Sequence, residues 1–146
     1  MAKKAGGQVL QFSFIGLTNA IVDLASLNLF LWIWPTEEAG LLLLFNTISY
    51  TLAIINSYFW NAKYTFGHHA KTDTREISLF IIQAIIALGI SNAVFIGLMW
   101  VFHLPGMMYF PLFIESNISK AMAMILSSTT SFFLMKFFVF RNRTEA

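Results

Sequence analysis

The chain has 146 residues, of which 58% are hydrophobic and only 11% are charged, and its mean hydropathy is +0.70. Soluble domains are roughly 45–50% apolar and about 25% charged, so this composition excludes an ordinary water-soluble domain. The absence of cysteine excludes disulfide bonds, thiolate metal sites and cysteine nucleophiles. The net charge of +2 is too small to indicate a nucleic-acid partner, and we expect none.

Four apolar stretches follow one another along the chain, and each has the roughly 20 residues that a helix needs to cross a bilayer. They cover residues 9–34, 41–60, 77–102 and 118–140. Proline, glycine and charged residues separate them, which is typical of connecting loops. The first stretch is too long for a cleaved signal peptide, and no small-residue cleavage site follows it. The sequence therefore predicts an all-α integral membrane protein with a single transmembrane domain over residues 1–146.

Lysine and arginine are distributed unevenly between the two sides of this four-span arrangement. Eight lie on the side of the termini and the central loop, whereas Lys120 lies on the opposite side. The eight are Lys3, Lys4, Lys63, Lys71, Arg75, Lys136, Arg141 and Arg143. Cytoplasmic loops are enriched in Lys and Arg, so both termini and the central loop are predicted to face the cytoplasm.

The two halves of the chain resemble each other. Gly16–Val22 (GLTNAIV) matches Gly89–Phe95 (GISNAVF) at an offset of 73 residues, and residues 56–66 match residues 130–140 at an offset of 74. Each half is predicted to be a helical hairpin that starts and ends on the same side. Duplication then gives parallel repeats related by an axis along the membrane normal. Asn19 and Asn92 are equivalent in this repeat.

Three segments resemble the GtrA family of small four-span membrane proteins. Phe14–Asp23 is similar to the family's opening segment, which contains a glycine, an Asn-Ala pair and an aspartate. Phe59–Phe66 (FWNAKYTF) resembles the family's ending of the second span, and Phe133–Phe140 resembles the matching ending of the fourth. The resemblance covers nearly the whole chain.

This resemblance implies a role in cell-surface polysaccharide biosynthesis or teichoic-acid glycosylation at the bacterial cytoplasmic membrane. The implied activity is translocation of a polyprenyl-phosphate-linked sugar to the outer leaflet of the bilayer. A membrane glycosyltransferase is the implied partner that loads the carrier. No cofactor is implied. No nucleophile motif, phosphate-binding glycine loop or spaced acidic pair is present, and we expect no enzymatic activity.

Two charged residues stand out among the candidate substrate-binding residues. Asp23 is the only acid near the middle of a span, and such a residue marks either a function or a paired partner that holds helices together. Lys120 is equivalent to Asn46 in the repeat and lies just inside the fourth span. It is either a ligand for phosphate in the outer leaflet or a lysine that extends to the nearby head groups.

The remaining candidates are polar residues that replace water around a phosphate and a sugar, since unmatched polar groups in hydrocarbon cost several kcal/mol each. They are Asn19, Asn56, Asn61, Lys63, Asn92 and Lys136. For Asn61, Lys63 and Lys136 the alternative is a topological role at the cytoplasmic interface. For Asn19 and Asn92 the alternative is hydrogen bonding between helices, with Gly16 and Gly89 allowing close packing there.

Two other functions remain open. A small proton-coupled multidrug-type exporter also has four spans and a membrane acid in the first, but often shows a weak Lys/Arg bias. A scaffold that recruits a glycosyltransferase without transport is compatible with the same residues. Four short helices enclose little space, so we expect either a groove open to lipid or a homo-oligomer.

Overall fold

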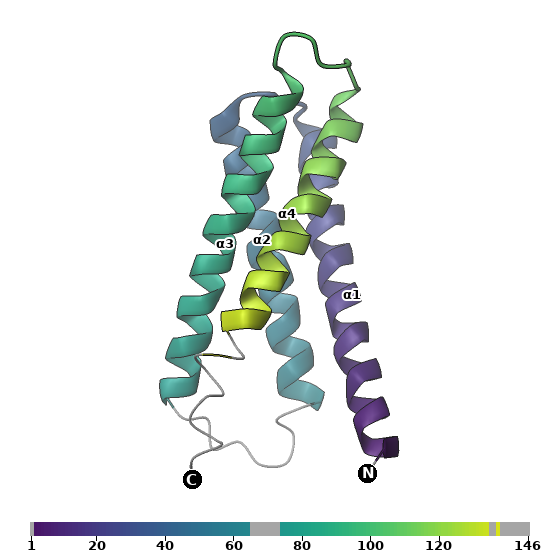
Figure 1. The fold of residues 1–146 in the computed structure, drawn as a ribbon, viewed down its shortest axis with the longest axis vertical. Helices are drawn as coiled ribbons and strands as arrows, with labels where there is room; N and C mark the ends of the chain where they lie inside the picture. The colour runs from purple at the N-terminus through teal and green to yellow at the C-terminus, as the bar shows by residue number, and fades with distance from the viewer. Residues whose placement is uncertain (1, 65–73, 135–136, 138–146) are drawn as a thin grey trace.

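The computed structural model describes residues 2–64, 74–134 and 137, with side-chain positions for all of them except residues 2–9, 11–13, 61–64, 76 and 132. Within these residues the chain forms four α-helices and no strand (Figure 1). They are α1 (Ala2–Ile33), α2 (Ala39–Tyr64), α3 (Thr74–Phe102) and α4 (Leu112–Leu134). The predicted all-helical fold is confirmed for this part of the chain.

Proline and glycine set the loops between the helices of each pair. α1 ends at Ile33, just before Trp34 and Pro35, because the residue that precedes a proline is driven out of the helical conformation. In the loop between α3 and α4, Gly106 has a φ of +92°, which a residue without a Cβ adopts at little cost. The two connections lie at the same end of the bundle (Figure 1).

α4 begins earlier than the sequence predicted. It starts at Leu112, six residues before the predicted start of the fourth span at residue 118. The carbonyl of Pro111 accepts hydrogen bonds from the amides of Ile114 (2.8 Å) and Glu115 (3.1 Å). Proline has no amide hydrogen to lose at the start of a helix. Pro111 therefore leads into the helix instead of interrupting it, and the predicted boundary at residue 118 is too late.

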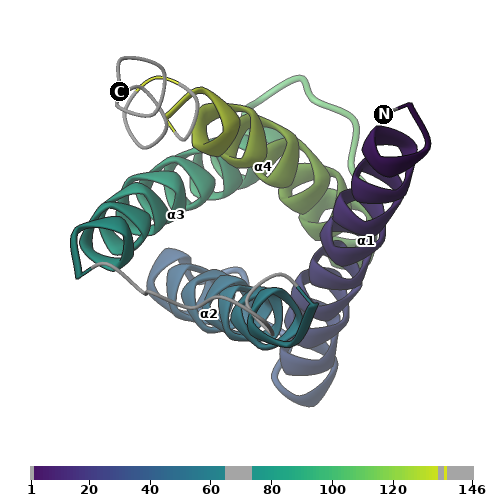
Figure 2. The same ribbon diagram turned by 90° about the horizontal axis from the view of Figure 1, so that it is seen from below.

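The helices form a ring in the order α1, α2, α3, α4 when viewed along the bundle (Figure 2). Close backbone contacts are most numerous within the α1–α2 and α3–α4 pairs and fewest between α1 and α4. We call the contact between α1 and α4 the seam. The end of the bundle with Ala2 and Leu134 is called the terminal end, and the end with the loops of residues 34–38 and 103–111 is called the loop end (Figure 1).

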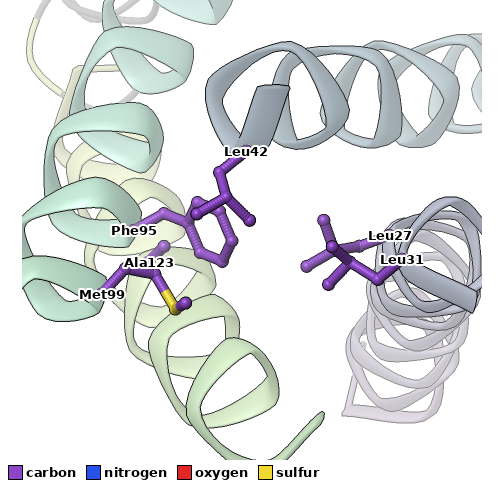
Figure 3. Packing of buried hydrophobic residues seen from close by; sticks show 6 residues of the cluster. All are labelled: Leu27, Leu31, Leu42, Phe95, Met99 and Ala123. Carbon is purple, nitrogen blue, oxygen red and sulfur yellow. The ribbon is translucent and has the colours of Figure 1, made fainter. Parts of the chain in front are cut away.

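An apolar core closes the half of the bundle nearest the loop end. Its buried members come from all four helices and point toward one another (Figure 3). They are Leu27, Leu31, Leu42, Phe95, Met99 and Ala123. Phe95 is the largest of the fully buried side chains. The interior nearer the terminal end is built differently, from polar side chains.

Three helices are long and apolar enough to cross a membrane: Phe14–Ile33, Ala39–Trp60 and Ile77–Phe102. Their outward faces carry large exposed apolar side chains, including Trp32, which is 80% exposed. α4 does not reach the same apolarity within the residues described, because it carries Glu115, Lys120 and a run of serine and threonine over residues 127–131. The crossing of the membrane by the fourth helix stays a prediction.

The small residues do not pack as predicted. Gly16 and Gly89 are exposed, and a Cβ built on either of them meets nothing within 4 Å. Asn19 and Asn92 point into the bundle about one turn further along, whereas the glycines lie on its outside. The prediction that helices pack closely at these glycines is therefore wrong for the isolated chain.

Candidate functional site

The centre of the bundle holds a buried ion pair. Nζ of Lys120 on α4 lies 2.6 Å from Oδ1 of Asp23 on α1, and the two side chains are 0% and 5% exposed. Lys120 therefore does not extend to the head groups, and the hypothesis that it does is wrong. Asp23 and Lys120 face each other across the seam. Burying charges is tolerated in a membrane when opposite charges pair.

An amide network continues from the ion pair toward α2 and α3. Lys120 Nζ donates a 2.5 Å hydrogen bond to Oδ1 of Asn46. Asn46 Nδ2 in turn donates to Oδ1 of Asn92 at 2.8 Å and to Ser91 Oγ at 3.3 Å. Asn92 Nδ2 donates to Oγ1 of Thr47 at 3.0 Å. All four helices thus meet in one hydrogen-bonded layer, which we call the polar layer.

Asn46 is a central residue of the polar layer, although its sequence context did not single it out as a site residue. The signal was its offset of 74 residues from Lys120, which makes the two positions equivalent in the repeat. Equivalent residues that lie near an axis between two repeats meet each other. The contact between Asn46 and Lys120 across the ring is what such an axis along the bundle produces.

A second polar cluster lies closer to the terminal end. Asn56 Nδ2 donates to Oδ1 of Asn19 at 2.8 Å, and Trp60 Nε1 donates to Oδ1 of Asn56 at 3.1 Å. Across the bundle Ser131 Oγ donates to Oε1 of Gln83 at 2.8 Å. These side chains are half-buried, in contrast to the fully buried centre of the polar layer. This cluster is thus less deeply buried than the polar layer.

The seam carries its own polar contact and a groove. Asn28 on α1 and Asn117 on α4 exchange two hydrogen bonds, each of 2.8 Å. Beside them a groove of about 380 Å³ opens near the loop end. Its lining residues are mostly apolar: Asn28, Leu31, Trp32, Pro35, Leu112, Phe113 and Ser116. The seam therefore offers an apolar recess that leads toward polar side chains.

The two loops at the loop end are joined by an exposed contact. Nε2 of His103 lies 3.3 Å from Oε2 of Glu37, and Nδ1 donates to the carbonyl of Met99 at 2.7 Å. The hydrogen bond to Met99 is the main cause that raises the pKa of His103, and the carboxylates of Glu37 and Glu115 add to it. His103 is therefore charged over a wider pH range than an ordinary histidine.

The structure places the predicted site residues in three groups. Asp23, Lys120 and Asn92 come together in the polar layer, and Asn19 and Asn56 form the cluster nearer the terminal end. Asn19 and Asn92 are repeat equivalents but do not share partners. The side chains of Asn61 and Lys63, and the whole of Lys136, lie outside the described residues.

The arrangement suits binding of a polar group rather than metal chemistry. In the described part of the chain no three His, Asp or Glu side chains are grouped so that they could hold a metal ion. The polar layer offers one cation, one carboxylate and several amides. Such groups can replace water around an anion or around sugar hydroxyls.

Comparison with known proteins agrees with the resemblance seen in the sequence. Residues 11–140 match the protein family described as GtrA/DPMS, transmembrane domain. Among curated proteins and solved structures there is no match. The family match covers most of the chain and fits the apolar helices described above. The chain therefore belongs to the GtrA/DPMS transmembrane-domain family, and it is a multi-pass membrane protein with a function related to glycosylation.

Proposed function

We propose that the protein moves a polyprenyl-phosphate-linked sugar between the leaflets of the bacterial cytoplasmic membrane. The observation that carries this proposal is the polar layer, in which a buried cation and several amides lie between apolar helices. A phosphate and a sugar lose their hydration in hydrocarbon, at a cost of several kcal/mol for each unmatched polar group. The polar layer supplies replacement partners inside the bundle.

The proposal requires α4 to cross the membrane with the other helices. α4 packs closely against α3, which is apolar enough to span. Ser116, Lys120 and Ser127 are buried in the bundle. The exposed hydroxyls of Ser128 and Thr129 both donate to the carbonyl of Ile125 on α4 itself. A helix that buries its cation and bonds its exposed hydroxyls to its own backbone crosses the bilayer although its mean hydropathy is modest.

The positive-inside rule places the terminal end in the cytoplasm. Four exposed aromatic residues gather near the loop end, as expected for a ring at the opposite interface. They are Trp32, Trp34, Trp100 and Tyr109. In this orientation the half-buried cluster around Asn56 faces the cytoplasmic leaflet, where a membrane glycosyltransferase loads the carrier. The apolar core then separates the polar layer from the outer side.

A scaffold that recruits the glycosyltransferase is the second candidate, and one observation favours it. The polar side chains of the interior largely satisfy one another, as in the pairing of Asn46 with Asn92 and of Asn28 with Asn117. Interhelical hydrogen bonds of this kind also serve only to hold membrane helices together. In a transporter these hydrogen bonds are exchanged for bonds to the lipid-linked sugar, whereas in a scaffold they stay intact.

Leaflet exchange in liposomes separates the two functions. Purified protein is reconstituted with a polyprenyl-phosphate-linked sugar, and the fraction accessible from outside is followed over time. Transport predicts faster exchange than in empty liposomes, and Asn46→Leu slows it. Thr129→Val is the matched control, because Thr129 is exposed and its hydroxyl donates only to the carbonyl of Ile125. Exchange no faster than in empty liposomes, with folded protein that binds a glycosyltransferase, would establish the scaffold instead.

A further inference from the structure

The carboxylate of Asp23 is held by a single partner. Its Oδ1 has no hydrogen bond apart from the ion pair with Lys120, and no hydroxyl or amide of the described residues donates to it. A buried carboxylate usually accepts several hydrogen bonds. Lys120 by contrast has three donors, of which Asp23 and Asn46 use two. The cation is therefore well placed while its anion is weakly held.

The groove at the seam leads toward this ion pair. Its residue Asn28 precedes the loop end on α1 and lies five residues from Asp23, which is a rise of about 7.5 Å along a helix. Ser116 of the same groove lies four residues from Lys120, a rise of about 6 Å. The amide contact between Asn28 and Asn117 bridges α1 and α4 beside this groove. The groove therefore lies about one helical turn from the buried cation, at the seam with the fewest close contacts in the ring.

Charge balance decides how an anion can reach Lys120. The pair of Asp23 and Lys120 is neutral, so an added anion would leave the dry interior with a net negative charge. The interior stays neutral when Asp23 takes up one proton as the anion arrives. Lys120 is the one partner of Asp23 among the described residues. When Asp23 is protonated, the contact with Lys120 is therefore the only one it loses, and the anion then occupies that place on Lys120.

We propose that the phosphate of a prenyl phosphodiester replaces the Asp23 carboxylate on Lys120 while Asp23 binds one proton from solvent. The prenyl chain lies in the seam groove, whose lining is mostly apolar, and Lys120 Nζ donates to the phosphate oxygens. This inference rests on the proposed function for the class of its ligand. It adds a chain-binding groove and a fixed ratio of one proton to one anion.

Few other titratable groups lie around Asp23, so few other groups could take up the proton that accompanies the anion. On α2 the titratable side chain that interacts electrostatically with Asp23 is the phenol of Tyr50. On α4 Glu115 lies on the same buried side as Lys120, more than one turn closer to the loop end. α3 carries no titratable side chain between Ile77 and Phe102. Lys120 is the only cation among the described residues that contacts Asp23.

Equilibrium binding to the full chain in lipid nanodiscs tests the exchange. The probe is radiolabelled farnesyl methyl phosphate, a monoanionic prenyl phosphodiester, measured at pH 6 and pH 8. One proton per anion makes the affinity of the wild type fall by about tenfold for each pH unit in the range where free Asp23 is ionised. Asp23→Asn mimics the protonated state, so its binding is independent of pH and exceeds that of the wild type at pH 8. Wild-type binding that does not depend on pH, or weaker binding by Asp23→Asn, overturns the proposal.

Two further probes separate the chain from the phosphate. Dimethyl phosphate has the same charge without the chain, and farnesol has the chain without the charge. Both are expected to bind much more weakly than farnesyl methyl phosphate, and farnesol without dependence on pH. Dimethyl phosphate that binds as tightly as farnesyl methyl phosphate shows that the groove plays no part and refutes the chain site.

Trp32→Ala tests the groove directly, with Trp100→Ala as its control. Trp32 lines the groove and Trp100 is similarly exposed on α3 away from it. Only Trp32→Ala is expected to weaken binding of farnesyl methyl phosphate, by several-fold. The double variant Asp23→Asn/Lys120→Gln, which buries no charge, checks that lost binding is not lost folding. Leaflet exchange without proton-linked binding would refute this inference and leave the proposed function standing, whereas the reverse result would refute only the function.

Discussion

Removing the buried cation should destabilise the protein strongly. Lys120→Met leaves Asp23 buried at 5% exposure without its one partner. Breaking a buried pair in this way costs about 3–5 kcal/mol. Protonation limits the cost, because keeping a carboxyl with an ordinary pKa near 4 protonated at pH 7 takes about 4 kcal/mol. The same arithmetic gives only about 1.5 kcal/mol at pH 5. The loss should therefore be about 4 kcal/mol at pH 7 and shrink as the pH falls.

The assay is unfolding of purified protein in mixed micelles, with wild type and variant compared at pH 7 and pH 5. The double variant Asp23→Asn/Lys120→Met removes both charges, and it should lie within about 2 kcal/mol of the wild type at both values. A Lys120→Met variant that loses less than about 1 kcal/mol at pH 7, against the 3–5 kcal/mol expected for a broken buried pair, would refute the reasoning. So would a loss that is the same at pH 5.

Three other predictions follow from contacts outside this pair. The contact between His103 and Glu37 stabilises the fold fully below the ordinary pKa of histidine. That stabilisation is lost as the pH rises through the raised pKa of His103. An NMR titration of His103 should show that Glu37→Gln lowers this pKa. Ser119→Ala should not lower the melting temperature, because the buried hydroxyl of Ser119 has no hydrogen-bond partner. A double-mutant cycle on Asn28 and Asn117 should give a coupling of about 0.5–1.5 kcal/mol in unfolding assays, and no coupling would show that the seam is not held by these amides.

The helices were largely predictable because apolar stretches of membrane length have few alternatives. The sequence predicted the C-terminal ends of α1 and α3 closely, at Ile33 and Phe102, whereas α1 begins at Ala2, seven residues before the predicted span. It failed at the start of α4, where Pro111 has one of two opposite meanings, a loop residue or the first turn of a helix. Composition along the chain does not distinguish them, since the role of Pro111 is visible only in the hydrogen bonds that its carbonyl accepts from the amides of Ile114 and Glu115.

The candidate site was predicted in its residue types but not in its pairing. Asp23 and Lys120 both stood out because charges within membrane spans are costly. Their contact could not be inferred, because it depends on how α1 and α4 rotate about their own axes in the bundle. Asn46 was within reach of prediction, since its equivalence to Lys120 in the repeat places both near a shared axis. Gly16 and Gly89 show the opposite case, in which a pattern that favours close packing lies on an exposed face.

The rate of leaflet exchange by Asp23→Asn/Lys120→Met tests the central claim most directly. This double variant retains the fold by the reasoning above but removes the charged pair from the polar layer. Liposomes containing wild type should exchange a polyprenyl-phosphate-linked sugar faster than empty liposomes, and those containing the double variant should exchange it no faster than empty ones. Exchange at the wild-type rate by the folded double variant would contradict the claim that the buried ion pair serves transport.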